Sequence, residues 1–215
     1  RIIRNAEGYV ERIVEAKDCT PQELAVTEIN TGIFCFKNRL LFAHLKEIRN
    51  DNAQQEYYLT DLVAIFNQCG LRVNALVADD PQETMGVNDR IDLAKAQKWM
   101  TRHECERHMR NGVTIIDPET VYIDVGVKIG ADTVIYPNVI IQGDTVIGER
   151  VTILSNSFLR NAVIADEVCI DSSKIVESSV GARTTIGPMS HLRNHTEIAE
   201  DCRIGNFVEF KNSHF

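Results

Sequence analysis

The sequence predicts an α/β segment, then a long connecting helix, then a parallel β-helix, in that order along 215 residues. Three observations predict this fold class. Strand-like and helix-like runs alternate in the first 88 residues, and a charged stretch free of internal glycine and proline follows them. From Ile129 onward, a large apolar residue returns at every sixth position.

The first 88 residues show the alternation typical of an α/β segment. Strand-like runs lie at 9–15, 29–36 and 73–77, and helix-like runs lie at 39–49 and 60–69. This length is too short for a doubly wound sheet that closes its own core. The twelve glycines are all isolated, so the sequence has no glycine-rich phosphate loop.

Residues 88–112, NDRIDLAKAQKWMTRHECERHMRNG, are rich in helix formers and predict one long, mostly exposed helix. Asn88 or Asp89 can cap its start, and Gly112 suits the position just past its end. Such a helix fits a rigid arm between two domains better than a core element.

The repeats after this helix give the strongest signal in the chain. A period of six fits neither an α-helix nor a flat sheet, but it fits a coil of three short strands, each sending one apolar side chain inward. The repeat continues through 164, 170 and 175, where two of the steps shorten to five residues. At about 18 residues per coil, the length of the stretch 125–215 predicts five coils. The inward positions are Ile129, Ile135, Ile141, Ile147, Ile153 and Leu159, then Val180, Ile186, Leu192, Ile198, Ile204 and Phe210.

Composition limits the class of ligand. A formal net charge of -8 gives no general attraction to nucleic acid or to an anionic membrane, so a phosphate-bearing ligand needs a local group of cations. No apolar run is long enough to span a membrane, and no signal segment is visible. The six cysteines are widely spaced, which predicts reduced thiols in a cytoplasmic protein. The chain starts without Met and stops within its repeats, so we expect a fragment.

Four segments in the first part carry a resemblance to a known family: IVEAKD (13–18), EINTGIF (28–34), NAQQEYYLTD (52–61) and GVNDR (86–90). Together they resemble the bifunctional N-acetylglucosamine-1-phosphate uridylyltransferase / glucosamine-1-phosphate acetyltransferase family. The resemblance implies that 1–88 is the C-terminal half of a Rossmann-like nucleotidyltransferase domain. It also implies a linker helix over 89–112 and, over 113–215, the N-terminal coils of a left-handed parallel β-helix of hexapeptide repeats with acetyltransferase function.

The same resemblance implies a sugar site in the first part. Glu15 and Asn30 match residues that bind N-acetylglucosamine, and Tyr58 and Thr60 match residues that line the same site. A carboxylate, an amide and an aromatic ring suit the hydroxyl and N-acetyl groups of this sugar. The alternatives are a solvated charge for Glu15 and a turn residue ahead of Gly32 for Asn30.

Asn88 matches the family's asparagine that contacts Mg²⁺ and the sugar nucleotide. An amide oxygen is a neutral ligand, and Mg²⁺ also needs carboxylate and phosphate oxygens. The family's aspartate ligand would lie before Arg1, so we expect no specific Mg²⁺ binding, and a helix cap is a compatible role for Asn88. Two departures from the family lie nearby: Gln55 replaces a usual glycine, and Asp89 stands where asparagine is also common.

In the repeats, IGPMSHLRNHTEI (186–198) and IGNFVEFKNS (204–213) resemble the stretch that binds the phosphate of the acceptor sugar, which implies this role for Arg193 and Lys211. Their spacing of 18 residues, one full coil, independently predicts that they stack about 4.8 Å apart and point outward. Two cations so close favour an anion between them. The alternative is a pair of solvated surface cations. Asn194 and His195 replace the family's usual Pro-Gly, so the bend there can differ.

Three histidines near the end of the chain have spacings unlike any common metal site: His191, His195 and His214. The resemblance places the catalytic histidine beyond Phe215, so we assign none of the three a catalytic role.

The resemblance implies a homotrimeric parent enzyme that acts on sugar-1-phosphates. It would transfer acetyl from acetyl-CoA to glucosamine-1-phosphate, then join the product to UTP with Mg²⁺ to give UDP-N-acetylglucosamine, a peptidoglycan precursor. We expect the chain alone to be inactive in both reactions. The competing hypothesis is a sugar-1-phosphate nucleotidyltransferase whose β-helix is only a trimerising scaffold.

Overall fold

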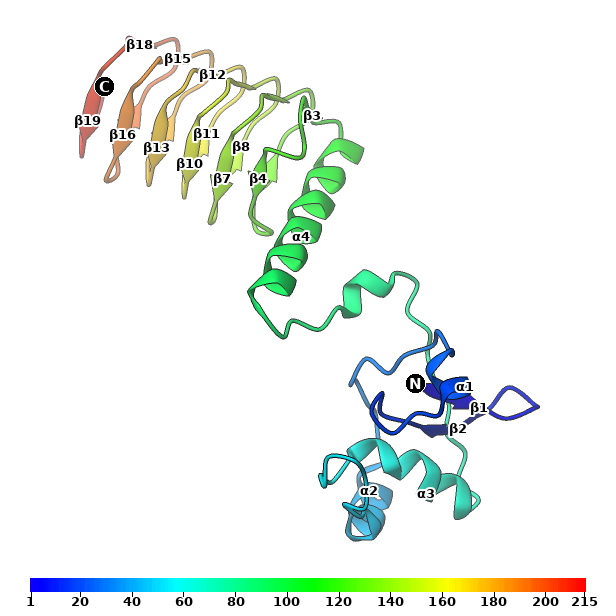
Figure 1. Ribbon diagram of the computed structural model, residues 1–215. Helices are drawn as coiled ribbons and strands as arrows, with labels where there is room; N and C mark the ends of the chain where they lie inside the picture. The colour runs from blue at the N-terminus through cyan, green and yellow to red at the C-terminus, as the bar shows by residue number, and fades with distance from the viewer. The chain divides into compact units, whose positions relative to one another are not determined.

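The computed structural model describes residues 1–215, and the chain divides into two compact units, Arg1–Gly86 and Val87–Phe215. Figure 1 shows the ribbon of both units. Each unit has a hydrophobic cluster of its own.

The second unit contains a left-handed parallel β-helix of about five turns, built from three parallel sheets (Figure 1). The first sheet comprises β3 (Thr114–Ile115), β6 (Val134–Ile135), β9 (Thr152–Ile153), β12 (Cys169–Ile170), β15 (Thr185–Ile186) and β18 (Arg203–Ile204). The second comprises β4 (Tyr122–Ile123), β7 (Ile140–Gln142), β10 (Phe158–Arg160), β13 (Lys174–Val176), β16 (His191–Arg193) and β19 (Glu209–Lys211). The third comprises β5 (Lys128–Ile129), β8 (Val146–Ile147), β11 (Val163–Ile164), β14 (Ser179–Val180) and β17 (Glu197–Ile198). The β-helix predicted from the sixfold spacing is therefore confirmed.

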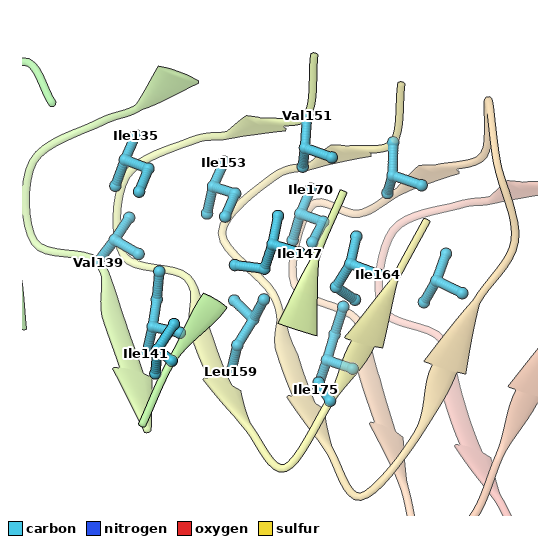
Figure 2. Packing of buried hydrophobic residues seen from close by; sticks show 14 of the residues in the cluster. Ile135, Val139, Ile141, Ile147, Val151, Ile153, Leu159, Ile164, Ile170 and Ile175 are labelled. Atoms are coloured by element: carbon cyan, nitrogen blue, oxygen red, sulfur yellow. The ribbon is translucent and has the colours of Figure 1, made fainter. Parts of the chain in front are cut away.

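The core of the β-helix is a column of aliphatic side chains, one from each short strand. In the first sheet Ile135, Ile153 and Ile170 occupy matching positions on successive coils and are fully buried. Figure 2 shows these side chains filling the interior of the coils. Burying an Ile or Leu contributes about 1.5–3 kcal/mol, so this column supplies most of the driving force for the fold.

Small hydroxyl residues line the corners of the coils. Thr133 Oγ1 donates to Gly148 O at 2.9 Å, and Thr184 Oγ1 donates to Ala199 O at 2.9 Å, although both side chains are fully buried. Ser190 Oγ donates in the same way to the carbonyl of Gly205. These bonds remove the cost of burying a hydroxyl group and tie one coil to the next.

The long helix predicted ahead of the repeats is α4 (Arg90–Arg110). Its cap is Asp89, whose side chain accepts a hydrogen bond from Asp92 N at 2.8 Å. The helix packs on β3 and β4, with Thr101, Cys105 and His108 buried (Figure 1). No helix of the chain combines the length and the apolar character needed to cross a membrane.

The first unit has a single sheet of two antiparallel strands, β1 (Ile2–Arg4) and β2 (Val10–Ile13). Its small core includes Ile48, Leu62 and Phe66. The helical elements are α1 (Pro21–Leu24), α2 (Asn38–His44), η1 (Leu45–Glu47), η2 (Leu59–Asp61), α3 (Leu62–Gln68) and η3 (Pro81–Thr84).

The prediction of a partial Rossmann-like nucleotidyltransferase fold for the first part is wrong. No parallel strand pairing occurs there, and the runs 29–36 and 73–77 form no strand. Ile33 is 77% exposed and Leu76 is 99% exposed, because neither segment has a neighbouring strand to cover it. An alternating apolar pattern becomes a strand only where another strand pairs with it.

Candidate functional site

The second sheet of the β-helix places Arg193 beside Lys211. The two residues are register partners on β16 and β19, and the residues before them, Leu192 and Phe210, face inward. The spacing of one coil therefore stacks the two cations, as the sequence predicts. Their role as phosphate ligands stays a prediction.

Glu209 is a partner of Arg193 that sequence reasoning missed. Arg193 Nε donates to Glu209 Oε1 at 2.6 Å, and this hydrogen bond holds the pKa of Glu209 below its usual range. His191 Nδ1 lies 4.0 Å from the same oxygen. Lys211 forms no ion pair in this chain, so its ammonium group is free for an external anion.

A mixed row of side chains lies on the same sheet, one coil after another, and it includes one further lysine. Phe158, Lys174 and His191 follow one another in register toward Glu209. Lys174 Nζ lies 5.3 Å from the centre of the Phe158 ring, and the Arg160 guanidinium lies 5.9 Å from it. Burial lowers the pKa of His191, and the nearby Lys174 lowers it further. Aligning the residue before each inward position coil by coil would have revealed this row.

In the first unit the structure brings Glu15 and Thr60 together. Thr60, which is 7% exposed, donates through Oγ1 to Glu15 Oε1 at the long distance of 3.5 Å. The hydroxyl of Tyr58 is buried without a hydrogen bond of good geometry, although the nearby Gln54 side chain lies close enough to lower its pKa. A buried hydroxyl without such a bond costs about 1–3 kcal/mol, so it marks a place where a ligand group can bind.

The side chains around Glu15, Tyr58 and Thr60 are mostly acidic. Burial raises the pKa of Tyr58, and the charges of Asp18 and Glu56 raise it further. Burial likewise raises the pKa of Asp61, with contributions from Asp51, Asp18 and Glu15. Carboxylates accept hydrogen bonds from sugar hydroxyls but repel phosphate, so the group suits the neutral part of a sugar ligand.

The turn before Tyr58 contains a residue other than glycine with a positive φ angle. Gln55 has φ of 55°, the left-handed conformation that glycine adopts easily. Asn52 holds the turn, since its Oδ1 accepts from Gln54 N at 3.1 Å and from Glu56 N at 3.2 Å. Ala53 N donates to Asp18 at 2.8 Å, which fixes the turn against the segment after Glu15.

Asn30 forms a local turn, and its role as a sugar ligand stays a prediction. Its Oδ1 accepts a hydrogen bond from Gly32 N at 3.2 Å, and Gly32 has φ of 77°. This is an Asx turn. No hydrogen bond joins the Asn30 side chain to Glu15, Tyr58 or Thr60.

Asn88 belongs to the second unit and is exposed, immediately before the cap of α4. The neighbouring carboxylate, Asp89, is engaged in that cap. Mg²⁺ requires several oxygen ligands, and these residues offer a single neutral amide oxygen. These residues alone do not fit a magnesium site, and we derive no step through the ion.

The bend after Arg193 is unusual. Asn194 and His195 both have positive φ, 54° and 60°, where the family commonly has Pro-Gly. His195 N donates to Glu177 O at 2.7 Å, which fixes the bend to the preceding coil. His214 Nδ1 lies 3.1 Å from Glu197, so this histidine also has a structural partner.

The fold and the stacked cations define the class of the second unit as a left-handed hexapeptide-repeat β-helix protein. The family model described as GMPPB C-terminal domain matches residues 117–214. The chain is 53% identical over 213 residues to the bifunctional protein GlmU of Lactobacillus johnsonii, covering 99% of this chain and 46% of that protein. It is 50% identical over 215 residues to GlmU of a Geobacillus species, covering all of this chain and 47% of that protein.

These matches confirm the resemblance predicted from the sequence: the chain is homologous to part of the bifunctional GlmU proteins. It spans about half the length of these relatives. Among solved structures, PerB from Caulobacter crescentus in complex with CoA and GDP-perosamine is 16% identical. That match covers 71% of this chain and 84% of that chain, with a TM-score of 0.44.

Proposed function

We propose that this chain is part of a bifunctional enzyme that makes UDP-N-acetylglucosamine. Its β-helix would hold the phosphate of glucosamine-1-phosphate while acetyl is transferred from acetyl-CoA to the sugar amine. The observation that carries the proposal is the pairing of Arg193 with Lys211 on neighbouring coils. The homology to GlmU supports the choice of substrate.

The donors around this pair favour a phosphate group. Arg193 uses only Nε toward Glu209, so its two terminal nitrogens remain available, and Lys211 adds a free ammonium group. A phosphate between them would accept from both, in charge-assisted hydrogen bonds worth about 1.5–3 kcal/mol each. Glu209 keeps the guanidinium oriented in the absence of ligand.

The proposal is tested by binding of glucosamine-1-phosphate to the 215-residue chain, measured by calorimetry. We expect Lys211→Ala to weaken binding about 10- to 100-fold, because one charge-assisted contact is lost. Lys128→Ala is the matched control, since Lys128 is an exposed lysine on another sheet. Equal affinity of wild type and Lys211→Ala, or equal affinity for glucosamine without phosphate, would contradict the proposal.

A second part of the proposal concerns the first unit, where Glu15, Tyr58 and Thr60 would bind the N-acetylglucosamine moiety in the uridylyl transfer from UTP. The buried hydroxyl of Tyr58 favours it. Asn30 would add an amide to this site in the whole enzyme. The whole enzyme would be a homotrimer, which the mass of the protein in solution can test.

A further inference from the structure

Outside these sites, three side chains with metal-binding chemistry converge in the first unit. His44 is the last residue of α2, Glu47 is the last residue of η1, and Cys69 directly follows α3. His44 Nδ1 lies 2.9 Å from Glu47 Oε1 and 4.0 Å from Cys69 Sγ. The nitrogen, oxygen and sulfur all lie within 4.8 Å of one another.

The backbone and the core hold this arrangement in place. The His44 ring packs edge-on against Phe66 at 5.6 Å, and Phe66 belongs to the small core of the unit. Cys69 is fixed at the end of α3, since Cys69 N donates to Ile65 O at 3.0 Å and Gly70, with φ of 71°, ends the helix. Glu47 has the most freedom to move, with half of its side chain exposed.

The set of ligands matches a thiophilic divalent ion. Zinc is bound by imidazole nitrogen and carboxylate oxygen at about 2.0–2.2 Å and by thiolate at about 2.3 Å, so tetrahedral ligands lie roughly 3.3–3.7 Å apart. The two separations of 2.9 and 4.0 Å lie on either side of this range. Displacements of the ligand atoms by less than about 1 Å would open the hydrogen bond between His44 and Glu47 and admit the ion.

We propose that His44, Glu47 and Cys69 form a binding site for a Zn²⁺-like ion, with a fourth position open to solvent. A thiolate ligand disfavours Mg²⁺ and Ca²⁺, which prefer oxygen. The C-terminal ends of α2 and α3 also carry a partial negative charge from their backbone dipoles, which favours a cation. This metal site is separate from the sugar-binding and phosphate-binding sites proposed above and does not depend on them.

The sequence alone did not reveal the site. His44 and Glu47 have the spacing of three that places two ligands on one helical face, but Cys69 lies 25 positions after His44. Only the packing of α2 beside α3 brings the thiol to them.

The test is titration of the reduced, metal-free 215-residue chain with Co²⁺ as a spectroscopic probe. We expect one equivalent to produce the sulfur-to-cobalt charge-transfer band and the intense visible bands of a tetrahedral site. Cys69→Ser should abolish the charge-transfer band, and His44→Gln should weaken binding at least 10-fold. Cys35→Ser is the matched control, because Cys35 is an exposed thiol of the same unit outside the cluster.

A second measurement needs no variant. Zn²⁺ should slow alkylation of Cys69 by iodoacetamide at least 10-fold, as mapped by mass spectrometry, and leave alkylation of Cys35 unchanged. The absence of a cobalt band in wild type, a band that persists in Cys69→Ser, or equal alkylation of Cys69 with and without Zn²⁺ would each overturn the proposal.

Discussion

At the scale of single residues, the coils of the β-helix pass so close to one another that some positions accept only glycine. A Cβ added to Gly181 would lie 2.4 Å from Glu200 N and 2.5 Å from Ala199 C. These are backbone atoms, so no side-chain rotation can relieve the contact. Gly130 is crowded in the same way by the backbone of Gly148. Gly205, by contrast, has nothing within 4 Å of the place that a methyl group would occupy.

We therefore expect Gly181→Ala to destabilise the second unit by about 2 kcal/mol or more, because the neighbouring coil must shift to admit the methyl group. Gly205→Ala, the control, should stay within about 0.5 kcal/mol of wild type. Urea unfolding followed by circular dichroism measures both. Equal midpoints for the two variants would show that neighbouring coils separate more easily than these contacts imply.

Individual polar residues were the hardest part of the site to predict. The stacking of Arg193 on Lys211 followed from spacing alone, because one coil fixes the distance along the axis. The hydrogen bond from Arg193 to Glu209 did not, since it depends on side-chain rotamers within a row of charges. Asn30 also shows the limit of residue type as a guide: its amide serves a local turn, a role that the sequence allowed equally.

At the scale of elements, α4, which packs on β3 and β4, carries a buried histidine near its C-terminal end. His108 is 2% exposed, and its Nε2 lies 3.0 Å from Arg107 Nη2, which requires a neutral ring that accepts the bond. Burial lowers the pKa of His108, and the positive charge of Arg107 lowers it further. Protonation of this ring is therefore more costly in the folded unit than in the unfolded chain.

The sign of the pH effect follows from this lowered pKa. The stabilising contribution of neutral His108 is complete above the ordinary histidine pKa of about 6.5, and it is lost as the pH falls through the folded value. We expect the urea midpoint of the second unit to fall between pH 7.5 and pH 5. His108→Gln should reduce this dependence, whereas the exposed His103→Gln should keep it. An unchanged pH dependence in His108→Gln would contradict this assignment.

The elements also show why one half of the fold was predictable and the other was not. Each inward position of the β-helix, such as Ile153 or Leu159, packs on residues one coil away, so its neighbours lie at a fixed sequence distance. The helices of the first unit were likewise expected from local pattern, and α2 and α3 overlap the predicted runs. The strands expected at 29–36 and 73–77 do not form, because no other strand of this chain pairs with them.

At the scale of the whole molecule, each of the two units has its own core, so we expect each to unfold separately. The cluster of the β-helix runs from Cys105 to Ile204, and that of the first unit surrounds Leu62 and Phe66. Residues 73–80 have no regular structure, and Leu76 and Val77 within them are 99% and 68% exposed. An exposed, irregular segment near the end of a compact unit is where a protease cuts first.

Thermolysin, which cuts before large apolar residues, should therefore cleave at Leu76 or Val77 and leave a β-helical product. We expect this product to keep the urea midpoint that the second unit has in the uncut chain, followed by circular dichroism and by the fluorescence of Trp99, the single tryptophan. Replacing Leu76 and Val77 with Asp should remove the cut. If the β-helix lost stability after cleavage, its folding would depend on contacts with the first unit, and the column of aliphatic residues would not be sufficient to hold its coils together.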